Sequence, residues 1–320
     1  MITILGAGVA GLCAATVLAE RGVPVQVVDS GPQGAGASWL AGGMLAPFVE
    51  AETAPPEVAR LGSCAADWWA ARVPGVVRRG TLVVAPSRDR TELDRFAART
   101  SGHEQIGAGR IAELEPDLAG RFPAALFYAG EAHLDPRAAL EALAGGLRNR
   151  GVTIRYKKLL APGQADIDCR GIAARDALPG LRALRGEMLM LHCPDVVLSR
   201  PVRLLHPRFP VYVVPRGNGL HMIGATMIES DATGPVTLRS ASELMSAAFA
   251  LHPGFAEAAI VSMGSGLRPA WPDNVPRLTN VAGRWHLNGL YRHGFLTAPA
   301  LAGQLADLLI QSRQEAALAY

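Results

Sequence analysis

Cysteine and lysine are both scarce in this sequence. The four cysteines stand 51, 105 and 24 residues apart along the chain, a spacing that fits neither a disulfide framework nor a CxxC metal site. Only two of the 31 basic residues are lysines, and these two are neighbours. We therefore expect no metal site and a cytoplasmic protein with reduced thiols.

Neither sign of charge predominates. The 31 basic and 28 acidic residues give a net charge of +3 and are scattered along the chain, so we expect no nucleic-acid partner. With 49% hydrophobic residues over 320 positions, the chain can build one large domain or two fused domains.

Residues 1–19 carry no charged side chain, and on length alone they could form a secretory signal or a short membrane span. No Lys or Arg precedes this run, and Gly6, Gly8 and Gly11 would each weaken a continuous helix by about 1 kcal/mol. A buried strand, a tight turn and a helix make better use of three glycines. We therefore expect no membrane association.

The first 29 residues predict a βαβ unit that binds a dinucleotide. An apolar strand at residues 2–5 leads into the motif GAGVAG, a helix over residues 10–21 and a second strand at residues 25–28. Gly6 permits the turn, Gly8 lets a pyrophosphate approach the backbone, and Gly11 lets helix and strand pack closely. Asp29 then accepts hydrogen bonds from ribose hydroxyls. The expected contacts here are Gly6, Gly8, Ala10, Gly11 and Asp29.

Residues 31–52, GPQGAGASWLAGGMLAPFVEAE, are rich in glycine and other small residues. A plain NAD-binding domain would continue into a helix, so we predict extended chain against a flat ligand. Here the sequence resembles the D-amino-acid oxidase superfamily of FAD-dependent oxidoreductases, and GASWLAGGMLAP is most similar to its glycine oxidase (ThiO-type) branch. The segments GSGLRPAWPDNVPRL and WHLNGLYRHGFLTAPALAGQLADLL resemble the C-terminal flavin signature of the same superfamily.

The resemblance implies an α/β fold, with a Rossmann-like FAD-binding domain and a second, mainly antiparallel β-sheet substrate domain. We assign residues 1–75, 130–178 and 262–320 to the first domain and residues 76–129 and 179–261 to the second. The sequence itself predicts a helix capped by Asp135, a hairpin turning at residues 217–219 and a helix over residues 298–309.

The resemblance also implies which further residues hold FAD. They are Ser38, Ala41, Gly42, Gly43, Met44, Arg268, Gly289, Tyr291, Gly294, Phe295 and Leu296. No cysteine follows Cys193 and no histidine precedes His103. The covalent links that some relatives make near the C-terminus and near the first glycine motif therefore cannot form, and we expect non-covalent FAD.

Three residues are expected in the substrate pocket. Arg292 occupies the place where the family's arginine grips the substrate carboxylate, which a guanidinium can hold through two parallel hydrogen bonds. Tyr212 matches a tyrosine whose hydroxyl contacts the same carboxylate, and Met227 matches a thioether that lines the pocket.

The activity implied is oxidative deamination of glycine or a similar small amino acid to the imine and glyoxylate. Dioxygen would be reduced to hydrogen peroxide, and the imine would supply thiamine thiazole biosynthesis. Departures from the family pattern at Asn274, Leu290 and His293 leave the exact amine open. A D-amino-acid or sarcosine oxidase or dehydrogenase, a tRNA-modifying flavoprotein and a non-catalytic flavin-binding protein remain alternatives, and whether the chain forms a homo-oligomer stays open.

Overall fold

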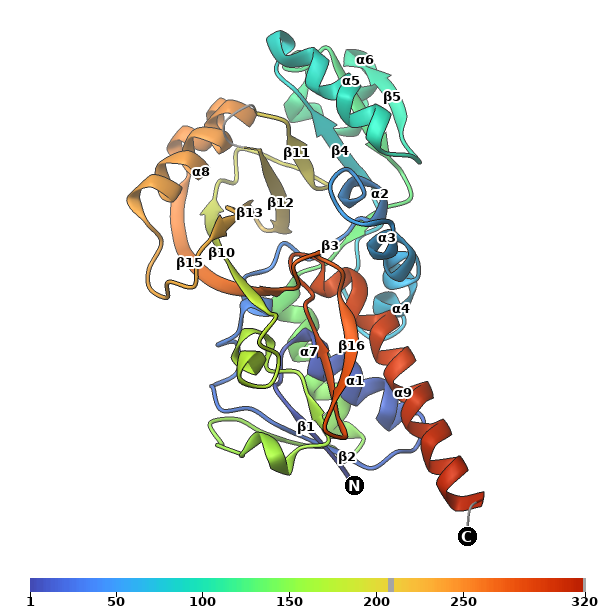
Figure 1. Cartoon of the computed structure of the whole chain (residues 1–320). Coiled ribbons are helices and arrows are strands. Elements are labelled where there is room, and N and C mark those ends of the chain that lie inside the picture. Colours follow the sequence, from blue (N-terminus) through green and yellow to red (C-terminus); the bar gives the residue numbers. More distant parts are fainter. Residues whose placement is uncertain (207–209, 319–320) are drawn as a thin grey trace.

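The computed structural model describes residues 1–206 and 210–318, and its strands form two large sheets and one small sheet (Figure 1). The first large sheet has the strand order β16-β17-β9-β1-β2-β8. Its strands are β1 (Ile2–Leu5), β2 (Val25–Val28), β8 (Thr153–Arg155), β9 (Ile167–Asp168), β16 (Arg277–Val281) and β17 (Arg284–Asn288). All neighbours pair in parallel except β16 and β17.

Three helices lie beside this sheet, α1 (Val9–Glu20), α7 (Pro136–Asn149) and α9 (Gly294–Leu318), and α1 packs against both of the others. Helix α1 is buried over most of its length because small and aliphatic residues occupy every face. The predicted βαβ unit of β1, α1 and β2 is confirmed. Asp135 caps α7 as predicted, since its carboxylate accepts a hydrogen bond from the Arg137 N–H at 2.8 Å.

The second large sheet is mainly antiparallel, as expected. Its order is β14-β10-β13-β12-β11-β4-β6-β5, and β15 pairs with β10. The strands are β4 (Thr81–Val84), β5 (Glu104–Gly107), β6 (Ala124–Tyr128), β10 (Arg182–His192), β11 (Val202–Leu204), β12 (Val211–Gly217), β13 (Leu220–Gly224), β14 (Ile228–Glu229) and β15 (Ala259–Ala270). The hairpin of β12 and β13 turns at the predicted GNG, where all three residues have positive φ. The predicted fold class is therefore confirmed.

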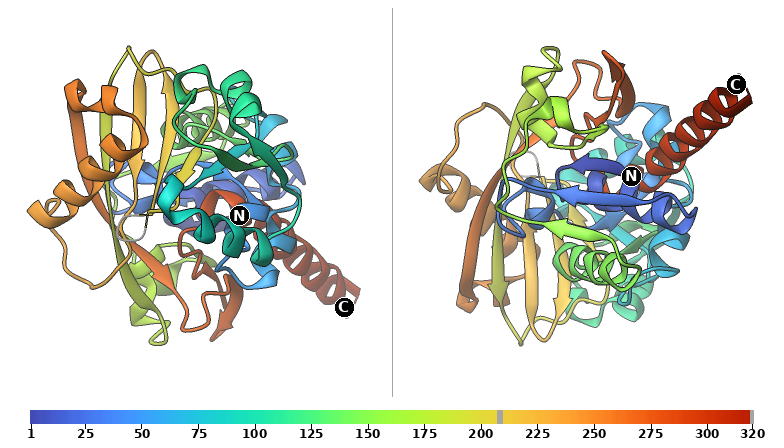
Figure 2. Two further views of the ribbon diagram at one scale, coloured as in Figure 1. Left: turned by 90° about the horizontal axis from the view of Figure 1, so that it is seen from above. Right: turned by 90° about the horizontal axis from the view of Figure 1, so that it is seen from below.

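The remaining helices surround the two large sheets. They are α2 (Pro47–Glu50), α3 (Pro56–Gly62), α4 (Ala65–Ala70), α5 (Arg90–Arg99), α6 (Ala108–Leu114) and α8 (Leu238–Leu251). Short 3₁₀ turns are η1 (Ala37–Leu40), η2 (Ser87–Asp89), η3 (Pro116–Leu118), η4 (Pro162–Gln164), η5 (Gly171–Asp176) and η6 (Pro253–Glu257). Figure 2 shows α9 leaving the body of the molecule toward its C-terminal end. No helix in the described part of the chain is long and apolar enough to cross a membrane.

Three expectations need correction. Residues 31–52 are not simply extended: they contain η1, α2 and β3 (Met44–Leu45), which pairs with β7 (Ala132–His133). Helix α9 begins at Gly294, four residues before the predicted start, so Pro299 lies inside the helix and cannot donate to the Phe295 carbonyl, which accepts the Trp69 indole N–H instead. Strand β15 belongs to the second sheet through Ala270, beyond the predicted domain boundary at residue 262. Residues 319–320 of the first assigned domain lie outside the described residues.

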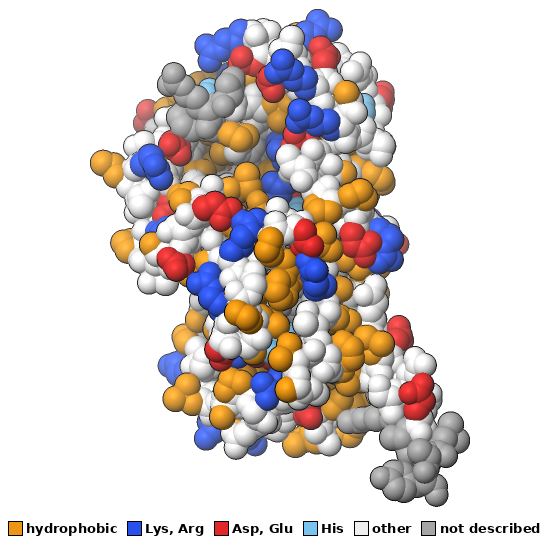
Figure 3. Space-filling model, viewed as in Figure 1, with side chains coloured by type: hydrophobic (Ala, Val, Ile, Leu, Met, Phe, Trp, Pro, Cys, Tyr) orange, Lys and Arg blue, Asp and Glu red, His pale blue; other side chains and the backbone are white. Residues whose placement is uncertain are grey.

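Separate hydrophobic cores support the two large sheets. In the first, Trp69 stacks on Phe295 with ring centroids 5.3 Å apart, and its indole N–H donates to the Phe295 carbonyl at 2.7 Å. In the second, buried side chains of β4, β6 and β10–β13 form one cluster with those of α8, which packs against β10, β12 and β13. On the face shown in Figure 3, basic and acidic side chains are interspersed, in keeping with the scattered charge of the sequence.

Candidate functional site

A cavity of about 790 Å³ is lined by residues of both large sheets and of the connections between them. This volume is typical of a site for a large organic ligand. Every residue predicted to contact the cofactor or the substrate lines this cavity, except Gly11 and Gly289. The structure therefore brings together side chains that the chain separates by more than 280 residues, from Gly6 to Leu296.

The first glycine motif forms one end of the cavity. Gly6 has φ +101°, and a Cβ there would lie 2.6 Å from the Cys169 carbonyl oxygen. A Cβ on Gly11 would lie 1.9 Å from the Gly6 carbonyl oxygen. Gly11 thus acts by letting α1 cross the turn closely, without facing the cavity. The α1 N-terminus begins after Gly8, where its amide groups and dipole favour a phosphate.

Asp29 shapes this end of the site more than the sequence indicated. Its carboxylate accepts hydrogen bonds from the backbone N–H groups of Ala7 at 2.6 Å and Gly31 at 2.8 Å. It ties the glycine turn to the end of β2 while still lining the cavity. The bond to Gly31 is an Asx turn, which the Asp-x-Gly spacing could have indicated.

The residues present fit FAD. The adenosine and pyrophosphate part of FAD fits the first end of the cavity. This end offers the N-terminus of α1, the half-buried Asp29 carboxylate and a wall of glycine and alanine residues. Gly43 lines the middle of the cavity, where its backbone lies close against Leu134. It has φ +69°, and a Cβ there would lie 2.1 Å from the Leu134 carbonyl oxygen. Ser38 closes the wall, accepting a hydrogen bond from the Val9 N–H at 3.1 Å.

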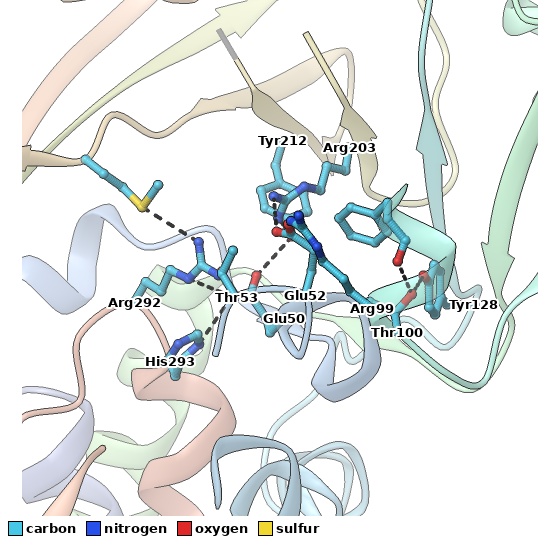
Figure 4. A network of polar contacts seen from close by, with 12 residues as sticks. Glu50, Glu52, Thr53, Arg99, Thr100, Tyr128, Arg203, Tyr212, Arg292 and His293 are labelled. Atoms are coloured by element: carbon cyan, nitrogen blue, oxygen red, sulfur yellow. Dashed lines mark hydrogen bonds and ion pairs between the residues drawn. The ribbon is translucent and has the colours of Figure 1, made fainter. Parts of the chain in front are cut away.

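The other end of the cavity holds a buried polar network around Glu50 (Figure 4). Arg292 Nε lies 2.9 Å from Glu50 Oε2, and His293 Nδ1 lies 3.3 Å from the same oxygen. The Tyr212 hydroxyl donates to Glu50 Oε1 at 3.0 Å. Arg203 in turn donates to the Tyr212 hydroxyl at 2.7 Å. Helix α2, the turn before α9 and strands β11 and β12 therefore meet at this carboxylate.

Electrostatics keep Glu50 ionised despite its position. Burial alone would raise the pKa of its carboxyl, but Arg292, His293 and Arg203 outweigh burial and hold the pKa well below its usual range. Burial lowers the pKa of His293, which therefore favours the neutral imidazole. Burial raises the pKa of the Tyr212 phenol, so Tyr212 remains a hydrogen-bond donor.

Arg268 is the cation of this cavity for which the described residues provide no carboxylate. It lies on β15, and its hydrogen bond goes to the Thr226 carbonyl at 2.9 Å. Burial lowers the pKa of its guanidinium to about 10, because a charge in a dry site is costly. The absence of a side chain at Gly186 leaves room for the Arg268 guanidinium, because a Cβ there would lie 2.3 Å from it.

A charge count at this end favours an anionic ligand. Glu50 pairs with Arg292, and Glu52 pairs with both Arg203 and Arg99, whereas Arg268 forms no ion pair among the described residues. A partly buried guanidinium inside a cavity normally has an anionic partner. We conclude that this end of the cavity suits a ligand with one carboxylate.

Met227, Tyr291 and Arg292 lie together at the same end of the cavity as Arg268. The Tyr291 hydroxyl lies 3.2 Å from the Met227 sulfur, and Arg292 Nη1 lies 3.7 Å from the same sulfur. Met227 is 53% exposed, so this cluster stands at the boundary between cavity and solvent.

Sequence reasoning missed Glu50 and Arg203, and it noted His293 only as a departure from the family pattern. An acid at the end of an otherwise apolar run, PFVE, was a weak signal for Glu50. Arg203 lies among other arginines in the sequence, and only its position opposite Tyr212 in the sheet distinguishes it.

Comparisons with known proteins agree with this geometry. A family model described as FAD dependent oxidoreductase (DAO) matches residues 1–308. Over 317 residues the chain is 55% identical to a Rhizobium etli protein assigned as the thiamine biosynthesis oxidoreductase ThiO, covering 97% of this chain and 96% of that protein. It is 27% identical over 347 residues to glycine oxidase of Pseudomonas aeruginosa, covering 96% and 94% of the two chains.

Solved structures show the same fold. Glycine oxidase from Geobacillus kaustophilus superposes with a TM-score of 0.82 at 22% identity, covering 97% of this chain and 94% of that one. Iminodiacetate oxidase from Chelativorans sp. BNC1 also superposes with a TM-score of 0.82, at 25% identity, covering 97% of this chain and 95% of that one.

Proposed function

The chain belongs to the DAO family of FAD-dependent oxidoreductases, and from this premise we propose that it oxidises glycine, or a similarly small amino acid, to the imine. Hydrolysis of the imine gives glyoxylate and ammonia, and dioxygen takes up the electrons to give hydrogen peroxide. The observation that carries the proposal is the partly buried Arg268, which has no ion-pair partner among the described residues and lines the cavity that also contains the dinucleotide motif. A carboxylate supplies the missing negative charge.

Two arginines and one phenol orient the substrate. Arg268 provides the unpaired charge. Arg292 provides Nη1, whose hydrogen-bond contact among the described residues is the Met227 sulfur at 3.7 Å, while its Nη2 donates to the Thr53 hydroxyl at 2.5 Å. Arg292 keeps the carboxylate-gripping role expected from the sequence, but it shares this role with Arg268, which the sequence had assigned to the cofactor. The Tyr212 hydroxyl adds a neutral donor. Charge-assisted hydrogen bonds from two directions fix both the position and the rotation of a small carboxylate.

Bound FAD supplies the hydride acceptor. The protein's contribution is to hold the α-hydrogen toward that acceptor, and orientation of this kind lowers barriers by up to about 7 to 11 kcal/mol in favourable cases. No side chain has to remove the α-hydrogen as a proton when it leaves as hydride. Met227 and Tyr291 cover the substrate end and limit its contact with water.

We also propose the biological setting. The Rhizobium etli relative carries a thiamine biosynthesis name, and an imine of glycine is a suitable building block for a thiazole ring. The thiols of Cys13, Cys64, Cys169 and Cys193 are all free, which suits a reducing cytoplasm. Non-covalent FAD and dioxygen complete the set of reactants.

A substrate panel tests the proposal. Peroxide formation is measured with glycine, sarcosine, D-alanine and a simple alkylamine. For each amine, this rate is compared with the rate at which the enzyme reduces a dye in the absence of oxygen. We expect glycine to give peroxide with the highest kcat/KM and the alkylamine, which lacks a carboxylate, to give almost none. Preference for sarcosine or D-alanine would assign the enzyme to that oxidase class, and reaction only with the dye would make it a dehydrogenase.

A further inference from the structure

We propose that Arg203 is a positioning residue that aims the Tyr212 hydroxyl at the substrate carboxylate. This inference rests on the proposed carboxylate site. Arg203 and Tyr212 stand directly opposite each other on β11 and β12, so their side chains share one face of the sheet. Arg203 Nη1 donates to the Tyr212 hydroxyl oxygen at 2.7 Å, and its guanidinium lies 5.0 Å from the centre of the Tyr212 ring.

The direction of this hydrogen bond decides where the phenol proton points. A phenol has a single proton, and its oxygen also accepts hydrogen bonds. Because Arg203 donates to that oxygen, the proton of Tyr212 cannot point to Arg203. It points instead to Glu50 Oε1 at 3.0 Å (Figure 4), and Glu50 lines the cavity. A substrate carboxylate that receives this proton takes the place of Glu50 as its acceptor. A neighbouring cation also makes the phenol a stronger donor to an incoming carboxylate.

Arg203 is itself held from several sides. Its guanidinium carbon lies 5.1 Å from the centre of the Phe96 ring, and Nη2 lies 3.4 Å from Glu52 Oε2. Glu52 also pairs with Arg99 at 3.0 Å. Only 9% of Arg203 is exposed, so its reorientation would leave a buried charge without these partners. The guanidinium is therefore fixed before any ligand arrives.

Arg200 provides a matched control three residues earlier. It is 7% exposed, its Nε donates to Glu115 at 2.7 Å, and its guanidinium lies 5.4 Å from the centre of the Phe127 ring. It therefore repeats the burial, the acidic partner and the aromatic neighbour of Arg203. It neither touches Tyr212 nor lines the cavity.

The experiment measures acetate binding to the FAD-loaded protein through the change in flavin absorbance, which requires no turnover. We expect Arg203→Met to weaken acetate about 10-fold, the scale of one hydrogen bond to a charged group. Arg203→Lys should recover part of this loss, because it keeps the charge without the fork. Arg200→Met should leave the Kd within about twofold. The KM for glycine should follow the Kd for acetate.

A double-mutant cycle separates positioning from general structural damage. In a Tyr212→Phe background, Arg203→Met should weaken acetate clearly less than 10-fold, because the hydroxyl that Arg203 aims is gone and only the loss of its positive charge remains. An undiminished 10-fold loss in that background, or an equal loss in Arg200→Met, overturns the proposal. Wild-type protein that binds acetate but oxidises no amino acid would refute the proposed function, and the cycle would still decide the role of Arg203. Absence of acetate binding by the wild type would overturn both.

Discussion

At the scale of single residues, the proposed carboxylate site combines several charged side chains. The sequence pointed to Arg292 as the carboxylate anchor, and the structure shows that its Nε is already paired with Glu50 at 2.9 Å. Arg268, which the sequence assigned to the cofactor, has no acidic partner among the described residues. The sequence could single out Arg268 and Arg292, but which acid lies opposite each one depends on tertiary contacts between α2, β15 and the turn before α9.

Arg268→Ala tests this division of charge. Truncation should cost about 2 to 5 kcal/mol in kcat/KM for glycine, because it removes the uncompensated partner of the carboxylate. Arg268→Lys should keep only part of the wild-type kcat/KM, since an ammonium group cannot form two parallel hydrogen bonds with a carboxylate as a guanidinium does. Steady-state rates are measured with FAD content checked in each protein. Loss of less than threefold in a fully loaded Arg268→Ala protein would refute the assigned role.

Arg292 needs a second variant, because its removal also leaves Glu50 without its main counter-ion. We expect Arg292→Ala to lower kcat/KM for glycine by about 2 kcal/mol or more. If Arg292 contacts the carboxylate, the double variant Arg292→Ala/Glu50→Gln should keep most of that loss. Full recovery of kcat/KM in the double variant would mean that Arg292 serves only to neutralise Glu50.

At the scale of elements, close backbone contacts carry the nucleotide end. Gly11 and Gly145 both lie inside helices, in α1 and α7. A Cβ on Gly11 would meet the Gly6 carbonyl oxygen at 1.9 Å, whereas nothing lies within 4 Å of a Cβ on Gly145. The motif spacing predicted the first contact because GAGVAG follows a strand, and no local pattern distinguishes the second glycine.

Opposite effects of two alanine substitutions follow. Gly11→Ala should destabilise the protein by about 3 kcal/mol and weaken FAD retention, because α1 must move away from the turn. Gly145→Ala should stabilise by about 0.5 to 1 kcal/mol, since it improves helix propensity without a clash. Denaturant unfolding and FAD release are measured for both. Equal stabilities for the two variants would contradict the close packing of α1 on the Gly6 turn.

The segment that carries Glu50 depends on another buried acid. Glu131 accepts hydrogen bonds from the N–H groups of Phe48 at 3.0 Å and Val49 at 2.8 Å, both in α2. Burial, with the negative charge of Glu50, raises the pKa of Glu131 from 4.5 to about 8. In the folded state Glu131 therefore keeps its proton through a pH range where the unfolded chain has lost it.

The sign of the pH effect follows from linkage. Between pH 4.5 and about 8 the folded protein binds one more proton than the unfolded chain, so stability falls as pH rises through this window. The free energy of unfolding of the wild type should fall by up to about 4 kcal/mol across this pH window, and Glu131→Gln should abolish that fall. Denaturant unfolding at pH 5 and pH 8 compares the two proteins. The control Glu115→Gln, which breaks the pair with Arg200, should lower stability at both values. An unchanged pH dependence in Glu131→Gln would contradict the buried, protonated Glu131.

For the whole molecule, the sequence predicted the architecture better than the details. The strand patterns, the glycine motif and the GNG hairpin are local, so they could be read directly and are confirmed. The start of α9 at Gly294, the short α2 and the extension of β15 to Ala270 were missed, because they depend on packing between the two halves of the chain. The acid at Glu50 was missed for the same reason.

The central claim is that one cavity joins an FAD site to a site for a small amino acid. The most direct test is the absorbance spectrum of the purified, FAD-loaded protein before and after glycine is added without oxygen. We predict that glycine removes the oxidised-flavin absorbance, that air restores it with formation of hydrogen peroxide, and that Arg268→Ala slows the first step. An unchanged spectrum with glycine and every other small amino acid, in protein that dithionite still reduces, would contradict the claim.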